Sequence, residues 1–315
     1  MKKTGILLLI SIVFKCSFAQ VKWVNVDSFY QPLPASIQIY KSTDSVEGKP
    51  NIMYYAIADL NDKGLYFTAD TTQNRRFTPA QYYEKNNQPL LVVNTSFFSF
   101  GTHQNFNVVV KNGKMVSYNQ HSIAGRGDDT LTYRHPFFSA IGFNKKGKAD
   151  VAWILSDTAK RRPYASNIPV VALHDSIADP SFKFLKASNG FYKWKMQTVV
   201  GGGPALVQNG AVNISNNIER KFAGKAINDL HPRTAMGYTK DNKLIVFVCE
   251  GRAENAAGLS LTQLAEILKN LDCEEALNLD GGGSTCMLIN GKPTNTPSAK
   301  GVQRPVPSVF MIMKR

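Results

Sequence analysis

Apolar and polar residues alternate in short runs along most of the chain, and turn-forming residues separate the runs. Runs of about four to eight residues bounded by Gly, Pro, Asn or Asp are typical of β-strands. Asn-Gly pairs at 112–113, 209–210 and 290–291 favour the positive φ angles of tight hairpins, so the sheets should be mainly antiparallel. We expect strands at 51–59, 64–69, 90–94, 107–110, 139–144, 149–155, 204–208, 235–238, 244–249, 277–280 and 286–289.

Helical periodicity is rare. The segment 261–271 places apolar residues on one face, and Ser260 with Gln263 forms the sequence signature of a capping box. Further helices are expected at 79–85 and near 178–187. The chain has 315 residues, 43% of them hydrophobic, and contains no low-complexity linker. This pattern predicts an α+β fold, a single domain of mixed, mainly antiparallel twisted β-sheets with a few packed helices.

The start of the chain has the pattern of an export signal. Lys2 and Lys3 precede an apolar run at 5–14, and the small residues at 17–19 suit cleavage before Gln20. We therefore expect a signal peptide at 1–19, a domain at 20–315, and a periplasmic or secreted location. The apolar run is shorter than the roughly 20 residues that span a bilayer, so no transmembrane segment is expected.

The chain is basic, with a formal charge of +14 that falls to +11 once the three lysines before residue 20 are removed. Such a surface suits nucleic acid, anionic glycans or anionic membranes. The sequence contains no zinc-finger spacing, RNA-binding aromatic signature or basic amphipathic helix, so an anionic glycan is the expected partner rather than nucleic acid. Three cysteines remain beyond residue 20, which excludes a disulfide scaffold; a bridge between Cys273 and Cys286 is one expectation and buried packing thiols are the other.

A glycine triplet after a predicted strand is the most informative feature of the sequence. The apolar run that ends at Asp280 continues directly into Gly281, Gly282, Gly283 and then Ser284. Glycines cost conformational entropy but let other groups approach the backbone closely, so we expect a ligand to lie on this segment. A second triplet follows the run that ends at Val200, and neither has the spacing of a nucleotide-binding loop.

Three further polar motifs lie at strand ends, at 94–98, 231–234 and 250–252. Each has a structural explanation when taken alone, such as a capped turn, a surface arginine or a hydrogen-bonded histidine. Arginines suit phosphate because the guanidinium group pairs with its oxygens, and Asn side chains suit sugar hydroxyls. The candidate residues from all five motifs are Asn94, Phe97, Phe98, Gly202, Gly203, His231, Arg233, Thr234, Glu250, Arg252, Asn278, Asp280, Gly281, Gly282, Gly283 and Ser284.

Taken together and in order, these motifs resemble the phosphodiester glycosidase family. The resemblance covers about 54–313 and includes a closing Arg-Pro-Val at 304–306. Two positions depart from the family pattern: Glu250 stands where Asp is expected, and Thr95-Ser96 replace smaller residues after Asn94. The resemblance implies an exported hydrolase that cleaves a glycosyl-1-phosphodiester, a sugar-phosphate-sugar or similar anionic glycan, at the anomeric C–O bond.

The expected roles follow from this chemistry. Asp280 and Glu250 are the candidate pair of catalytic carboxylates, with His231 as an accessory group. Arg233 and Arg252 are the candidate phosphate ligands, assisted by backbone amides of the glycine loops. Asn94 and Asn278 would bind sugar hydroxyls, and Phe97 or Phe98 would line the pocket. No cofactor is expected. Two alternatives stay open: a phosphodiesterase that cleaves P–O with a divalent metal, for which no ligand spacing is present, and a non-catalytic module that binds anionic glycans.

Overall fold

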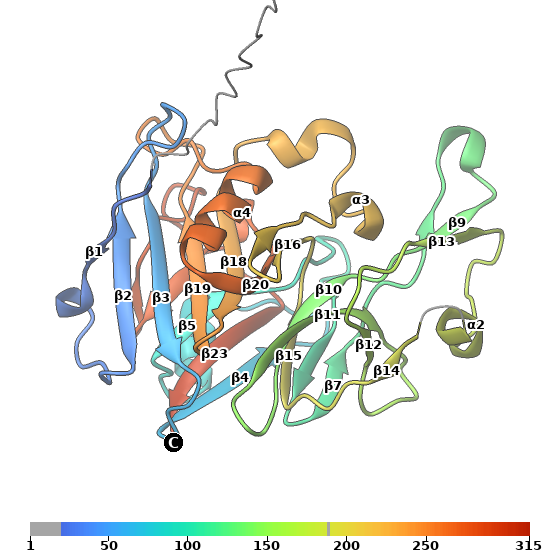
Figure 1. The fold of residues 1–315 in the computed structure, drawn as a ribbon, viewed down its shortest axis with the longest axis horizontal. Coiled ribbons are helices and arrows are strands. Elements are labelled where there is room, and N and C mark those ends of the chain that lie inside the picture. The colour runs from blue at the N-terminus through green and yellow to red at the C-terminus, as the bar shows by residue number, and fades with distance from the viewer. Residues whose placement is uncertain (1–19, 188–189) are drawn as a thin grey trace, which may run out of the picture.

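The structure is a computed structural model that describes residues 20–187 and 190–315. Four antiparallel sheets form the framework of the described residues, with the eight-stranded and seven-stranded sheets side by side (Figure 1). The predicted signal peptide lies outside the described residues. Within the described residues, no helix is long and apolar enough to cross a membrane.

The two large sheets contain most of the strands. In spatial order the eight-stranded sheet is β1 (Val24–Asn25), β2 (Ile37–Ser42), β3 (Met53–Asp59), β19 (Lys243–Cys249), β18 (Arg233–Thr239), β20 (Cys273–Asn278), β16 (Ala205–Gln208) and β17 (Ala211–Val212). The seven-stranded sheet is β14 (Tyr192–Lys193), β12 (Tyr164–Ser166), β11 (Ala149–Leu155), β10 (Ser139–Phe143), β15 (Thr198–Gly201), β6 (Val109–Lys111) and β7 (Lys114–Ser117).

Two smaller sheets complete the fold. The five-stranded sheet is β22 (Lys292–Pro293), β21 (Met287–Ile289), β5 (Leu91–Asn94), β23 (Ser308–Lys314) and β4 (Leu65–Thr71). The three-stranded sheet is β13 (Leu173–Asp175), β9 (Tyr133–His135) and β8 (Ile123–Ala124), and it projects from the upper right of Figure 1.

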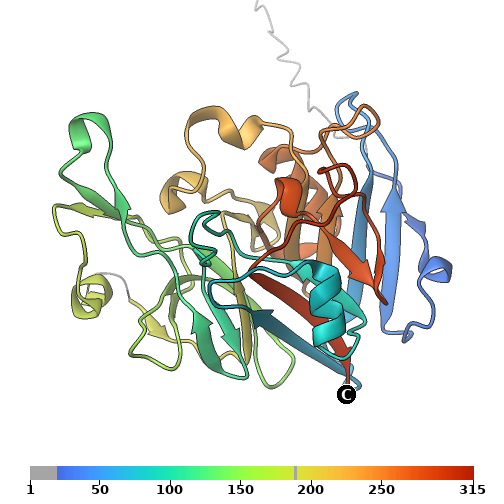
Figure 2. The ribbon, with the colours of Figure 1, turned by 180° about the vertical axis from the view of Figure 1, so that it is seen from behind.

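Among the described residues, four α-helices lie around the sheets: α1 (Pro79–Lys85), α2 (Phe182–Ala187), α3 (Asn216–Glu219) and α4 (Leu261–Asn270). Helix α4 packs its apolar face on the eight-stranded sheet (Figure 1), and α1 packs against β5 and β21 of the five-stranded sheet (Figure 2). Short 3-10 helices occur at Asp27–Phe29, Gly127–Asp129, Gly224–Asn228 and Gly282–Ser284.

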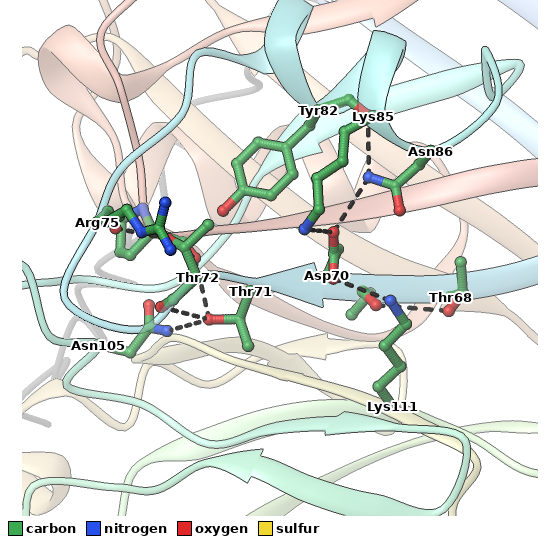
Figure 3. Close-up of polar contacts among 12 residues, drawn as sticks. Thr68, Asp70, Thr71, Thr72, Arg75, Tyr82, Lys85, Asn86, Asn105 and Lys111 are labelled. Atoms are coloured by element: carbon green, nitrogen blue, oxygen red, sulfur yellow. Dashed lines mark hydrogen bonds and ion pairs between the residues drawn. The ribbon is translucent and has the colours of Figure 1, made fainter.

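One continuous core joins the three larger sheets. It contains Ile39 of the eight-stranded sheet, Ile141 of the seven-stranded sheet and Phe310 of the five-stranded sheet, all fully buried. Asp70 on β4 adds a polar tie, because its carboxylate pairs with Lys85 of α1 at 2.7 Å and Lys111 of β6 at 2.9 Å (Figure 3). A shared core of this kind is the property of a single domain.

Most of the expected elements are present, and every strand pairing is antiparallel, so the mainly antiparallel prediction is confirmed. The helix at 79–85 and the capping box of α4, with Gln263 N donating to Ser260 Oγ at 3.1 Å, are also confirmed. Strand β20 ends at Asn278, before the predicted end at Asp280. Several elements were not predicted, among them β2, β9, β12, β13, α3 and the seven-residue strand β23. The Cys273–Cys286 bridge is wrong, because these thiols are buried in different apolar clusters.

Candidate active site at the Asp280 glycine triplet

The backbone of Asp280 is held from both sides. Its N–H donates to Thr95 O at 2.7 Å, and its carbonyl accepts from the side-chain amide of Asn94. Asn94 Oδ1 in turn accepts from Thr234 Oγ1 at 3.0 Å and from the Cys286 amide at 3.1 Å. Both polar groups of the buried Asn94 side chain are therefore used inside the protein, which fixes the direction of the strand exit.

The Asp280 carboxyl group lies in a cationic environment. Burial raises its pKa to about 6, while the Ser284 hydroxyl and the positive charges of Arg304 and Lys221 oppose that rise. Arg304 Nη1 also donates to Ser284 Oγ at 3.3 Å, so the arginine and the carboxylate meet at one hydroxyl. A carboxyl group with a pKa near 6 takes up or releases a proton near neutral pH, which suits acid–base work.

The glycines after Asp280 make room for two arginines. A Cβ atom on Gly283 would lie 2.1 Å from Arg304 Nη2, and one on Gly282 would lie 3.1 Å from Arg252 Nη2. Gly282 also has a φ angle of +61°, which favours glycine. Both guanidinium groups thus lie on backbone that carries no side chains. The bare surface that the sequence suggested for a ligand is covered by the protein's own cations.

Arg252 is exposed and held in an unusual backbone conformation. Its φ angle is +65°, in the left-handed region that non-glycine residues seldom adopt. Its Nη2 donates to His231 Nδ1 at 3.2 Å. Burial and the charges of Arg233 and Arg252 lower the pKa of His231, so the ring is neutral at pH 7 and Nδ1 accepts the hydrogen bond. His231 therefore positions Arg252.

Arg233 serves a different purpose from Arg252. It is buried, and its Nε donates to Leu259 O while its Nη2 donates to Asp229 O, both at 2.8 Å. Burial lowers its pKa to about 10, so it remains charged at neutral pH. These two donors join the start of β18 to neighbouring loops and are not available to a ligand.

The second glycine triplet packs against β20. Gly203 N donates to Asn278 O at 2.8 Å, and Asn278 Nδ2 donates back to Gly203 O at 3.0 Å. A Cβ atom on Gly202 would lie 2.4 Å from Asn278 O, and one on Gly203 would lie 2.3 Å from Glu219 Oε2. The structure therefore places both glycine triplets beside the end of β20. Protein atoms fill the space over Gly202 and Gly203.

Lys221 is a site residue that the sequence did not reveal. Its Nζ lies 3.8 Å from the centre of the Phe97 ring and 4.4 Å from that of Phe138. Burial lowers its pKa to about 7, while the carboxylates of Glu219 and Asp280 oppose that shift. The sequence around Lys221 is polar and has no helix or strand periodicity. Only its charged residues could have identified this segment as part of the site.

Glu219 fixes the position of this segment. It is fully buried and accepts hydrogen bonds from Ser139 N, Ser139 Oγ, Ala205 N, Ser215 Oγ and Trp153 Nε1. Burial raises the pKa of its carboxyl group, and the donors counteract that shift. Because these donors come from β10, β11, β16 and the residue before α3, Glu219 attaches the short helix firmly beside Asp280.

Other predicted residues lie in or near the core. Glu250 accepts from Thr296 N at 2.8 Å, and burial raises the pKa of its carboxyl group. Different neighbours set the pKa of each carboxyl group, Thr296 and Lys41 at Glu250 and Ser284, Arg304 and Lys221 at Asp280, and the expected carboxylate pair stays a prediction. Phe98 packs in an apolar cluster, whereas Phe97 contacts Lys221.

The comparisons with known proteins identify the family of this chain. The family model described as phosphodiester glycosidase matches residues 87–313, which include every motif around Asp280. The chain belongs to the phosphodiester glycosidase family. The prediction drawn from the ordered motifs is therefore confirmed.

Curated relatives are similar over parts of the chain. The N-acetylglucosamine-1-phosphodiester alpha-N-acetylglucosaminidase of Mus musculus is 31% identical over 124 residues, which are 39% of this chain and 23% of that protein. The Homo sapiens protein of the same name is 33% identical over 101 residues, 30% of this chain and 19% of that protein. The matched part therefore spans about a fifth of each relative.

Two solved structures share the fold. The zebrafish N-acetylglucosamine-1-phosphodiester alpha-N-acetylglucosaminidase catalytic domain, auto-inhibited by its pro-peptide, has a TM-score of 0.57 and 20% identity over 95% of this chain and 87% of that one. A hypothetical protein from Synechocystis has a TM-score of 0.60 and 16% identity, and the match covers 89% of this chain and 62% of that one.

The described residues contain no group of three or more His, Cys, Asp or Glu placed to hold a metal ion. The expectation that this phosphodiester glycosidase needs no cofactor stays a prediction, and the labelled-water experiment below addresses the alternative.

Proposed function

We propose that this protein hydrolyses a glycosyl-1-phosphodiester at the anomeric C–O bond. The observation that carries the proposal is the position of two cations at one carboxyl group, with a third cation over the adjoining glycine. Lys221 and Arg304 act on the Asp280 carboxylate, and the guanidinium groups of Arg252 and Arg304 lie over Gly282 and Gly283. The curated relatives, which are named for an N-acetylglucosamine-1-phosphodiester, support a substrate of that class.

The arginines suit the leaving group. When the bond between C1 and oxygen breaks, the bonding electron pair leaves with the phosphate monoester, and negative charge grows on its oxygens. Arg252 and Arg304 are positioned to pair with that charge, because their guanidinium groups are not fully engaged elsewhere. A phosphate monoester leaves without a strong general acid, so a second catalytic carboxyl group is not required.

Asp280 acts on the sugar side of the bond. Above pH about 6 its carboxylate stabilises the positive charge that develops at C1. The same carboxylate accepts the proton of the attacking water, whose oxygen becomes the new C1 hydroxyl. Lys221 keeps this carboxylate ionised. Asn94, Thr234, Asn278 and Arg233 position the loops, and Glu250 holds the segment at Thr296.

Hydrolysis in ¹⁸O-labelled water tests the bond assignment. With an N-acetylglucosamine-1-phosphodiester as substrate, we expect the label on the sugar and none on the phosphate. Label on the phosphate, with activity lost on chelation, would instead establish the metal-dependent phosphodiesterase. Substrate binding without turnover would establish the glycan-binding module.

Two substitutions test the site. Asp280→Asn should reduce kcat at least about 1,000-fold while leaving the unfolding transition in place, because it removes a group used in the chemistry. Asp128→Asn is the matched control, since Asp128 is exposed in the 3-10 helix after β8. Equal activity of the two variants would show that Asp280 is not catalytic.

Export is part of the same proposal. The basic start, apolar run and small residues before Gln20 support it. The mass of the protein recovered from the periplasm or medium should correspond to a chain that starts near Gln20. A full-length mass in the cytoplasm would contradict it.

A further inference from the structure

A groove of about 570 Å³ lies outside the Asp280 site. Its walls are the end of β4, the loop at 104–106, and strand β7 with the residues that follow it. Figure 3 shows one end of it, where Asn105 Nδ2 donates to Thr71 Oγ1 at 2.9 Å beside Thr72. None of the lining residues belongs to the group around Asp280, so the groove is a separate feature.

The composition of this groove is unusual for so basic a protein. None of the twelve residues that line it is Asp, Glu, Lys or Arg, although charged residues make up 19% of the chain and about two would be expected among twelve. Half of them are carboxamides: Gln73, Asn74, Gln104, Asn105, Asn119 and Gln120. Phe106 and Tyr118 add half-buried aromatic rings.

Two of the carboxamides form a rigid base. Asn119 is 4% exposed; its Oδ1 accepts from Val108 N at 2.8 Å and its Nδ2 donates to Ile154 O at 3.0 Å. Asn105 links Thr71 to Ser308 Oγ, which donates to Asn105 Oδ1 at 3.0 Å. These bonds tie the groove to the seven-stranded and the five-stranded sheets, so its shape is formed before any ligand arrives.

Other carboxamides are free to bind. Gln73, Asn74 and Gln104 are exposed, and within the described residues none of their side chains makes a hydrogen bond. Each carboxamide offers two N–H donors and one carbonyl acceptor, which match the combined donor and acceptor character of a hydroxyl group. The rings of Phe106 and Tyr118 offer apolar surface to the C–H face of a ring-shaped ligand.

We infer that this groove binds an uncharged oligosaccharide. An anionic or cationic ligand would lose hydration there without meeting an opposite charge among the lining residues, whereas a neutral sugar exchanges water hydrogen bonds for carboxamide ones. A peptide added to the edge of β7 is disfavoured, because Met115 N in that strand already donates to Arg161 O at 2.9 Å. The groove also adjoins the loop that carries Phe97, whose ring contacts Lys221, since Phe106 N donates to Phe97 O at 2.8 Å.

Calorimetric titration of the Asp280→Asn protein tests the inference without relying on hydrolysis. The probes are neutral tetrasaccharides of glucose, galactose, mannose and N-acetylglucosamine, with a sulfated oligosaccharide and an extended Asn/Gln-containing peptide for comparison. At least one neutral probe should bind with Kd of about 10 μM–1 mM. Its affinity should be unchanged between low and high salt, because no charged group lines the groove.

Variants assign the binding to the groove. The double variant Gln73→Ala/Gln104→Ala should weaken binding of the neutral probe at least fivefold, while Gln38→Ala, an exposed carboxamide on β2, should leave it unchanged. In the otherwise native protein, the double variant should retain its hydrolytic rate. No binding of any neutral probe at about 5 mM, salt-sensitive binding of the sulfated probe alone, or binding of the peptide alone would overturn the inference.

Discussion

Substituting Gly283 by alanine should disable the active site without unfolding the protein. The new Cβ would lie 2.1 Å from Arg304 Nη2 and 2.5 Å from Arg304 Cζ. Restoring a contact of about 3.5 Å requires the guanidinium group to retreat by about 1–1.5 Å. The group that moves is the end of a flexible, half-buried side chain, so the free energy of unfolding should change by less than about 1 kcal/mol.

The loss of activity follows from the interaction that is displaced. A hydrogen bond to a charged group contributes about 1.5–3 kcal/mol, so losing the contact between Arg304 and the phosphate should lower kcat/KM by about 10- to 150-fold. Arg304→Ala should lose a similar factor. If the two substitutions act through one contact, the double variant should be no worse than Arg304→Ala alone. Kinetics on an N-acetylglucosamine-1-phosphodiester measure all three.

Gly202→Ala is the matched control. Its Cβ would lie 2.4 Å from Asn278 O and 2.7 Å from Leu279 Cδ2, atoms of a buried backbone and a buried side chain. Relief requires a shift of β20, so the cost should appear as about 1–3 kcal/mol of lost stability in urea unfolding. Full activity of Gly283→Ala, or losses that multiply in its combination with Arg304→Ala, would refute the displacement of Arg304.

Three further outcomes follow from buried groups. The kcat/KM should rise with pH through about 6, where Asp280 ionises. In Lys221→Met the rise should move to higher pH, because a cation that lowers the Asp280 pKa is gone. Superimposable pH profiles of the two proteins would contradict this. Glu219→Gln should lower the free energy of unfolding by about 2–5 kcal/mol, because the new amide nitrogen would face donors such as Ser139 N and Trp153 Nε1. Urea titration followed by tryptophan fluorescence measures this loss of stability. An unchanged unfolding midpoint would contradict the prediction. In the chain from Gln20 onward, all three cysteines should react with a thiol reagent after unreduced denaturation, whereas a single reactive thiol would reveal a disulfide.

Local signals in the sequence were sufficient for several elements. Helix α1 begins at Pro79 after its cap Thr78, and α4 begins after Ser260, because capping and periodicity are local properties. The motifs at strand ends were also readable from sequence, since a short apolar run followed by glycine is a local pattern. These signals located the loop after β20 and identified the family.

Burial could not be read in the same way. Asn94 and Arg233 have side chains that suit a sugar and a phosphate, but the structure uses their hydrogen bonds inside the protein. Lys221 was missed because its position depends on Glu219, whose donors come from β10, β11 and β16. No property of the local sequence predicts that contact, since it forms only when sheets distant along the chain pack together.

The arrangement of charge explains why the proposed reaction suits this site. Counting Glu219 and Asp280 against Lys221, Arg252 and Arg304 leaves one positive charge when Lys221 is protonated, which balances the single negative charge of a phosphodiester. Cleavage at C1 leaves this net charge unchanged, but it separates a cation on the sugar from a second anion on the phosphate. A site with a carboxylate toward one side and two guanidinium groups over the adjoining glycines stabilises the separated charges more than the intact ester, and that difference is what lowers the barrier.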